Sequence, residues 1–207
     1  TCIFILHVRI KLTSSTKMKK GEYLKIILKT DRTVFSVKDI AILWKDANTD
    51  AARVRLNYYV KRGYLYRIRR GLYAKDTNYN KMELATKIST PSYISFETVL
   101  IKEGLIFQFQ DSITVASYLS REITVDNQKY TLKRIKKQVL INNLGINISD
   151  SISIASKERA FLDTLYINGD YHFDNTRSLD WDKVNLILPI YNNKRLEKLV
   201  RKLYKQK

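Results

Sequence analysis

The sequence predicts an α+β protein built in two parts, and two patterns in its 207 residues indicate this fold class. Apolar residues recur with helical spacing in residues 22–62 and again after residue 156. Between residues 113 and 141, β-branched and aromatic runs alternate with turn-forming residues, which is typical of paired strands. We therefore expect an N-terminal part made of helices and one hairpin. A mixed α+β part with a mainly antiparallel sheet should follow it.

The chain length fits two small domains, and composition suggests their limits. Residues 1–17 lack an initial methionine, whereas Met18 opens an ordinary helix, so we expect residues 1–17 to be a non-native or upstream leader. The N-terminal domain is expected at residues 18–76 and the C-terminal domain at residues 77–207. The polar residues 76–80 are typical of a linker between them.

Three short helices are expected in the first domain. The first begins near Glu22 and ends at the polar residues 30–33. Ser36, with an acid three residues later, approximates a capping box and opens the second helix. Asn48 begins a start signal for the third helix, and Gly63 lies just past its end.

The third helix has two different faces. On a 3.6-residue period one stripe is apolar and must pack on the first two helices: Ala52, Leu56, Tyr59 and Val60. The opposite face carries Asp50, Val54, Asn57 and Lys61, with Arg53 and Arg55 on its flanks. An amphipathic helix is by itself more often a packing element than a DNA reader. Whether this helix contacts DNA must therefore be judged from the segment that follows it.

Residues 63–74, GYLYRIRRGLYA, have the pattern of a tight β-hairpin around an Arg69-Arg70-Gly71 turn. Three helices followed by a cationic hairpin are the elements of a winged helix-turn-helix domain. In that domain the third helix lies in the major groove of DNA, and the hairpin reaches phosphates or the minor groove. The alternative is a winged helix that contacts proteins. The predicted DNA contacts are Thr49, Asp50, Arg53, Arg55, Asn57, Lys61, Arg67, Arg69 and Arg70.

The second domain is expected to alternate helices and strands. The helices are expected at residues 81–88, from Ser95 to Glu103, from Ser156 through Leu165, and near residues 181–188 and 193–204. The strands are expected at residues 113–117, 122–125, 129–137 and 139–141, joined by hairpins.

The net charge of +18 is unevenly distributed along the chain. Residues 1–75 hold 18 Lys and Arg against 5 Asp and Glu, whereas residues 76–207 hold 20 against 15. The composition is that expected from an AT-rich genome, which makes proteins basic without any role in nucleic-acid binding. Such a bias in composition would not concentrate the excess of positive charge in one third of the chain. The distribution therefore favours nucleic-acid contact by the N-terminal third.

Two further cationic runs lie in the second domain, at residues 129–137 and 194–207. They indicate either a second surface for phosphate, RNA or a partner protein, or ordinary solvated positions. For residues 129–137 the second alternative includes an edge strand kept soluble by lysine. The residues assigned to this second basic surface are Lys129, Lys133, Lys137, Lys198, Arg201 and Lys202.

The chain lacks the residues that several classes of binding site require. Cys2, His7 and His172 are the only cysteine and histidines, so we expect neither a disulfide framework nor a cysteine-based or two-histidine metal site. No two of the six glycines lie within two residues of each other, which excludes the glycine loops that bind dinucleotides or nucleoside triphosphates. No apolar run approaches the roughly 20 residues of a transmembrane helix. We expect no metal, cofactor or membrane insertion.

We also expect no catalytic residues. Restriction-type nucleases place a lysine two residues after a metal-binding acid, and neither Glu-x-Lys nor Asp-x-Lys occurs in the chain. His172 lies close to Asp174, but no nucleophile-bearing turn such as G-x-S-x-G is present, so we expect a loop histidine. Asp180 is expected to cap a helix.

Three segments together resemble the AbiEi family of antitoxins from type IV toxin–antitoxin, or abortive infection, systems. The first is RGYLYRIRRGLYA at residues 62–74. The second is SYISFETVL at residues 92–100 with GLI at residues 104–106, and the third is IASKERAFLD at residues 154–163. They extend over about residues 20–175, beyond which we find no resemblance.

The resemblance implies a transcriptional regulator with a winged-helix domain that binds double-stranded DNA at its own promoter. It also implies a cytoplasmic antitoxin whose C-terminal domain counteracts a cognate nucleotidyltransferase toxin without a stable complex. Val99 and Phe161 depart from the residues that the family prefers, which affects packing. The residues themselves support DNA binding only. The alternative function is therefore a nucleic-acid-processing enzyme, or an RNA-binding module, delivered by a winged helix.

Overall fold

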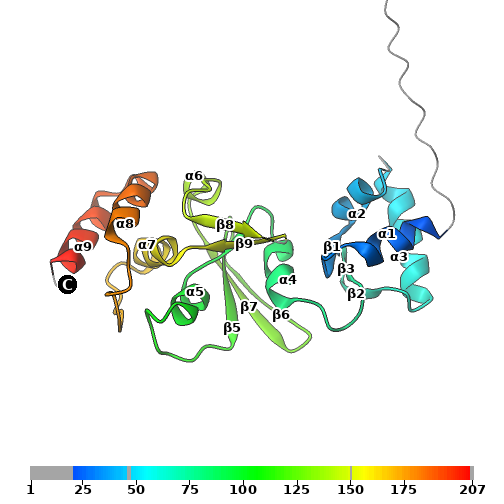
Figure 1. Ribbon diagram of the computed structural model, residues 1–207, viewed down its shortest axis with the longest axis horizontal. Helices are drawn as coiled ribbons and strands as arrows, with labels where there is room; N and C mark the ends of the chain where they lie inside the picture. The colour runs from blue at the N-terminus through cyan, green and yellow to red at the C-terminus, as the bar shows by residue number, and fades with distance from the viewer. Residues whose placement is uncertain (1–20, 46–47, 150, 206–207) are drawn as a thin grey trace, which may run out of the picture.

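The computed structural model has a mixed α+β fold and describes residues 21–45, 48–149 and 151–205. The expected leader at residues 1–17 lies outside the described residues. The described chain is elongated, with the N-terminal helices at one end, a large sheet in the middle and the last helices at the other end (Figure 1). No helix among the described residues has the length and apolar character needed to cross a membrane.

The N-terminal part contains the three predicted helices and the predicted hairpin. Its elements are α1 (Glu22–Lys29), β1 (Val34–Ser36), α2 (Val37–Leu43), α3 (Thr49–Lys61), β2 (Tyr66–Arg69) and β3 (Leu72–Ala74). The strands form an antiparallel sheet in the order β1-β3-β2. The capping box is present, since the Ser36 hydroxyl accepts from the Asp39 amide and the Asp39 carboxylate accepts from the Ser36 amide. Strand β1 was not predicted, because three residues are too few to show a period.

This small sheet lies between two cores. On one face Phe35 and Tyr73 pack with the buried side chains of α1, α2 and α3. On the other face Val34, Leu72 and Ala74 join the large core of the C-terminal part. The sheet therefore connects the two parts of the chain.

The C-terminal part packs helices against a six-stranded sheet. Its elements are α4 (Lys81–Ile88), β4 (Tyr93–Ile94), α5 (Glu97–Lys102), β5 (Ser112–Ser117), β6 (Arg121–Val125), β7 (Gln128–Arg134), α6 (Lys137–Leu140), β8 (Ile146–Ser149), β9 (Ile152–Ala155), α7 (Lys157–Asn168), α8 (Trp181–Ile187), the 3₁₀ helix η1 (Leu188–Tyr191) and α9 (Lys194–Tyr204). The strand order is β6-β7-β5-β4-β9-β8. Three of its five pairings are antiparallel, and β5-β7 and β4-β9 are parallel.

One strand prediction in this part was too long and another was wrong. The strand expected at residues 129–137 ends at Arg134, and the strand expected at residues 139–141 is instead covered by helix α6 and its C-cap. Val139 and Leu140 are buried, and so short an apolar run fits a helical turn as well as a strand. Strands β4, β8 and β9 were missed, because none of them exceeds four residues.

Strand β7 also has an unexpected position. It forms the predicted hairpin with β6, but it pairs in parallel with β5 on its other side. Consecutive hairpins would have paired β5 with β6. Because β7 is an inner strand, the edge-strand explanation of its lysines was wrong.

The helix caps follow the sequence closely. Side chains of Ser156, Asp180 and Asn193 accept hydrogen bonds from backbone amides in the first turns of α7, α8 and α9. The helix expected from Ser95 begins later, at Glu97, because the preceding residues belong to β4 and the loop after it.

The residues predicted as a linker are part of the packed structure. Tyr79 is buried, and Asn80 caps α4. From α4, the buried Glu83 carboxylate accepts hydrogen bonds from the Thr33 amide at 2.8 Å, the Thr33 hydroxyl at 2.7 Å and the Val34 amide at 3.1 Å. The two parts are therefore joined by polar contacts as well as by the shared core.

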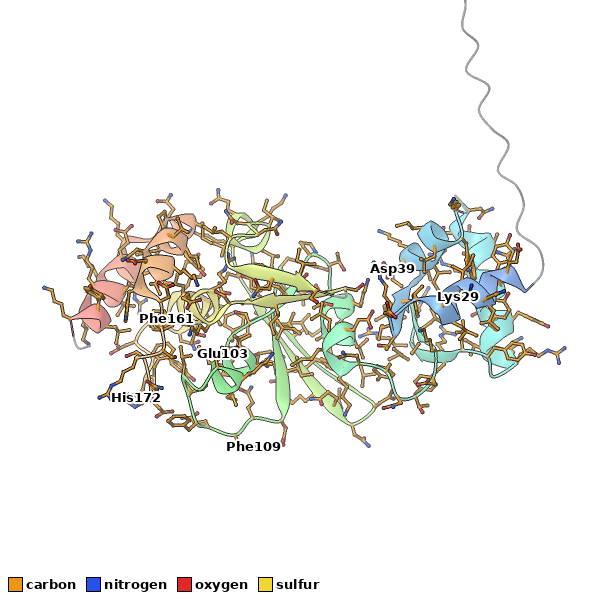
Figure 2. The ribbon with its side chains drawn as sticks, in the orientation of Figure 1. Lys29, Asp39, Glu103, Phe109, Phe161 and His172 are labelled. Atoms are coloured by element: carbon orange, nitrogen blue, oxygen red, sulfur yellow. The ribbon has the colours of Figure 1, made fainter. Side chains whose placement is uncertain are left out.

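Two more contacts fix the N-terminal part on the large sheet. Lys87 of α4 forms a 2.9 Å ion pair with Asp39 of α2, on the side of the N-terminal part that faces α4 (Figure 2). The hydroxyls of Tyr66 and Tyr79 donate to Asp126 in the β6–β7 turn. Burial, together with the bond to Asp126, raises the pKa of Tyr79 and keeps its hydroxyl protonated as a donor.

Candidate nucleic-acid interface

Helix α3 presents one polar face to solvent, on the side away from the large sheet (Figure 1). Its first turn is fixed by Asn48, whose side chain accepts from the amides of Asp50 and Ala51. Ala52, Leu56 and Tyr59 are buried, as predicted. Four residues of the opposite face are exposed, as expected: Asp50, Val54, Asn57 and Lys61.

The charges on this face are partly paired. Arg53 is exposed and forms a 2.7 Å ion pair with Asp50, one turn before it. Both groups are open to water, so the pair is easily exchanged for other partners. Thr49 is half-buried at the first position of the helix.

The Arg55 side chain packs against two aromatic rings within the N-terminal part. Its guanidinium carbon lies 3.6 Å from the centre of the Tyr23 ring and 5.3 Å from the centre of the Trp44 ring. The Trp44 indole in turn donates to the Tyr23 carbonyl at 2.8 Å. Arg55 thus packs α3 on α1 and α2, although the sequence predicted a DNA contact. The signal that sequence reasoning missed is a pair of aromatic residues facing this flank of α3.

The arginines of the hairpin lie at the surface. Gly71, with a φ of 83°, and Arg70 form the turn between β2 and β3. Arg67 and Arg70 are exposed and Arg69 is half-buried, whereas strand β3 is buried. No ion pair within the described residues engages any of these three arginines.

Other groups of the N-terminal part are exposed beyond the predicted contacts. Tyr58 is 46% exposed on α3, and the Arg62 guanidinium lies 5.6 Å from the centre of its ring. Lys38 and Lys45 are exposed on and just after α2. Sequence reasoning omitted these four residues. The helical period that selected Asn57 also makes Tyr58 its outward neighbour.

The second basic surface is divided between distant elements. On β7, Lys129 pairs with Glu122 at 3.0 Å, and Lys133 pairs with Glu97 at 2.5 Å. Lys137 is exposed at the start of α6. Three more cations, Lys198, Arg201 and Lys202, are exposed on α9, at the end of the molecule opposite α3 (Figure 1). These six residues do not form one continuous surface.

A buried polar cluster holds the C-terminal part together. The Asp163 carboxylate accepts from Ser95 at 2.7 Å, Tyr93 at 3.0 Å, Tyr191 at 2.6 Å and the Arg159 guanidinium at 3.2 Å. Burial raises the pKa of Asp163, and the charge of Arg159 opposes that effect. Two of the segments that carry the family resemblance supply four of these five residues. Their side chains are buried, so the cluster belongs to the interior of the C-terminal part rather than to a binding surface.

The remaining candidate groups do not converge. His172 is 90% exposed on a loop, 3.6 Å from Asp174, and Phe109 lies on another outer loop (Figure 2). Within the described residues, no three His, Cys, Asp or Glu side chains gather in a way that could hold a metal ion.

No model of a known protein family matches this chain, and no curated protein matches it. The candidate nucleic-acid interface consists of the polar face of α3 and the arginine hairpin that follows it in the chain.

Proposed function

We propose that this protein is a DNA-binding transcriptional regulator and that its N-terminal part is a winged helix-turn-helix domain. The observation that carries the proposal is the element order α1-β1-α2-α3-β2-β3 with sheet order β1-β3-β2. In a winged helix, the second and third helices form the helix-turn-helix and the last two strands form the wing. The three-residue β1, unexpected from the sequence, completes this arrangement and so supports the proposal.

The proposed DNA contacts divide between α3 and the wing. The major groove of B-DNA admits one α-helix, and α3 offers it an exposed face with Asn57 and Lys61. Asn57 suits an adenine edge, whereas Lys61 and Arg53 suit phosphates. From the wing, Arg67, Arg69 and Arg70 reach flanking phosphates or the minor groove.

The resemblance to AbiEi antitoxins supports a further role. We propose that the protein represses its own promoter in the cytoplasm and, through residues 77–207, counteracts a cognate nucleotidyltransferase toxin without a stable complex and without catalysis. A nucleotidyltransferase reading frame beside this one, toxic alone and harmless when co-expressed with this chain, would support the antitoxin role. If co-expression leaves the toxicity unchanged, the antitoxin role is wrong and DNA binding is unaffected.

The cations of α9 are the part of the second basic surface that we propose for phosphate contact. Within the described residues, Lys198, Arg201 and Lys202 form no ion pair, whereas Lys129 and Lys133 each have an acidic partner. An exposed helix with unpaired cations attracts a polyanion over several ångströms.

DNA binding is tested by the affinity of the full chain for duplex DNA from its own upstream region. We expect Arg69→Ala with Arg70→Ala to weaken binding to all duplexes alike, because phosphates are common to every sequence. Asn57→Ala should instead reduce the preference for the upstream duplex over a shuffled one, by about tenfold for one lost base contact. Fluorescence anisotropy measures both effects.

Lys102→Ala with Arg177→Ala is the matched control, since it removes the same charge from exposed positions outside the proposed surface. An arginine-hairpin variant that binds like the wild type would contradict the proposal. Magnesium-dependent cleavage of labelled DNA, abolished by mutating a carboxylate pair, would favour the alternative of a nucleic-acid-processing enzyme.

A further inference from the structure

Val54 occupies the middle of the outer face of α3 and makes no contribution to the core. Its side chain is 71% exposed, whereas Ala52 and Leu56 beside it are fully buried. Valine is a weaker helix former than alanine, and exposing its methyl groups to water is unfavourable. Burial in the core therefore does not explain a valine at this position.

The neighbours of Val54 on this face are mainly polar. Asp50 lies one turn before it, and Arg53 precedes it. Asn57 and the aromatic Tyr58, which is 46% exposed, lie one turn after it. Single exposed aliphatic residues are common on protein surfaces, and Leu186 on α8 is one of them. Val54 differs from Leu186 because it lies one turn before Asn57, the side chain proposed to read an adenine edge.

We propose that Val54 recognises the C5-methyl group of a thymine in the major groove, an inference that rests on the proposed function. Thymine is the only base that carries a methyl group there, and apolar side chains read it by contact. Asn57 is three residues further on, about 4.5 Å along the helix axis, and its amide suits adenine. The recognised site thus contains A·T pairs under the centre of α3, with the thymine methyl against Val54.

The test removes the methyl group alone. The full chain first selects duplexes from a random-sequence library, and each thymine of the selected duplex is then replaced in turn by deoxyuridine, which lacks only the C5-methyl. At one position we expect wild-type affinity to fall about fourfold, the change expected for one buried carbon. For Val54→Ala, the same replacement should change affinity by less than about twofold, since the contact is already absent.

Two variants serve as controls. Leu186→Ala removes an exposed aliphatic side chain from the far end of the molecule and should keep the full dependence on the methyl group. Arg70→Ala should bind more weakly but keep the same methyl dependence, because phosphate and base contacts are separate. Circular dichroism should give the same folded spectrum for all variants, since each of these side chains is exposed.

The outcomes separate the inference from the proposed function. If no duplex is selected, DNA binding itself is wrong and the inference falls with it. If duplexes are selected but no deoxyuridine replacement affects the wild type, the inference is overturned while DNA binding stands. The same conclusion follows if the replacement affects wild type and Val54→Ala equally.

Discussion

Single residues in this chain show how position decides the role of a charge. Arg53 and Arg55 are both on the flanks of the polar face of α3, and sequence alone gave no reason to separate them. In the structure Arg53 is exposed, whereas Arg55 lies against the rings of Tyr23 and Trp44. The distinction depends on which side chains α1 and α2 bring to that flank, which no local pattern in α3 contains.

Arg55→Ala should therefore destabilise the protein rather than remove a phosphate contact. We expect the free energy of unfolding to fall by about 1 kcal/mol, the typical size of a partly desolvated cation–π contact. Urea unfolding measures this loss. The slope of DNA affinity against salt concentration should stay that of the wild type, and a slope reduced by about one would show instead that Arg55 contacts a phosphate.

Asp39 provides a prediction for pH. Burial opposes its charge, but the Ser36 amide, the Lys87 ammonium and the Ser36 hydroxyl outweigh burial and hold the pKa of Asp39 below its ordinary value of 3.8. A carboxylate with a lowered pKa stabilises the folded state above its ordinary pKa, and this stabilisation disappears as the pH falls through the lowered value.

The corresponding experiment compares wild type with Asp39→Asn. Their free energies of unfolding should differ by a constant amount at neutral pH, and the difference should shrink as the pH falls from about 5 through the lowered pKa of Asp39. Urea unfolding at a series of pH values measures it. A difference that stays constant through this range would mean that the charge of Asp39 does not contribute.

At the scale of elements, the sequence predicted those structures whose signals are local. Helices α2, α3 and α7 combine apolar residues at helical spacing with a capping residue, and α1 has the apolar residues alone. All four were predicted. Strands β1, β4, β8 and β9 have between two and four residues and are defined by their partners. The partners of β1 and β4 lie far away in sequence, as in the pairing of Ile94 with Ile154, whereas β8 pairs with the adjacent β9. Such distant pairings cannot be derived from a local pattern.

The N-cap of α3 gives a prediction at this scale. Asn48→Ala removes the side-chain oxygen that accepts from the Asp50 and Ala51 amides, and it should lower the free energy of unfolding by about 1 kcal/mol. Asn48→Asp keeps an acceptor and should preserve stability. Fraying of the first turn should also weaken DNA binding by the Ala variant. Equal stability of the two variants would contradict this account of the cap.

At the scale of the whole molecule, the two parts are more closely joined than the sequence indicated. Composition predicted a linker at residues 76–80, but Tyr79 is buried and Glu83 binds the start of β1. The candidate interface was partly predictable, because helical spacing selected Asn57 and Lys61 and the hairpin pattern selected the arginines. The separation of the second basic surface between β7, α6 and α9 could not be predicted, because it depends on how the strands and helices are arranged in space.

The most direct test of the central claim is the salt dependence of duplex binding by the full chain. If the α3 face and the wing together neutralise about six phosphates, affinity should fall roughly a thousandfold between 50 and 200 mM salt. Replacing Arg67, Arg69 and Arg70 by alanine should lower the slope by about three. An affinity that does not change with salt, or a slope unaffected by the three replacements, would contradict DNA binding through this surface.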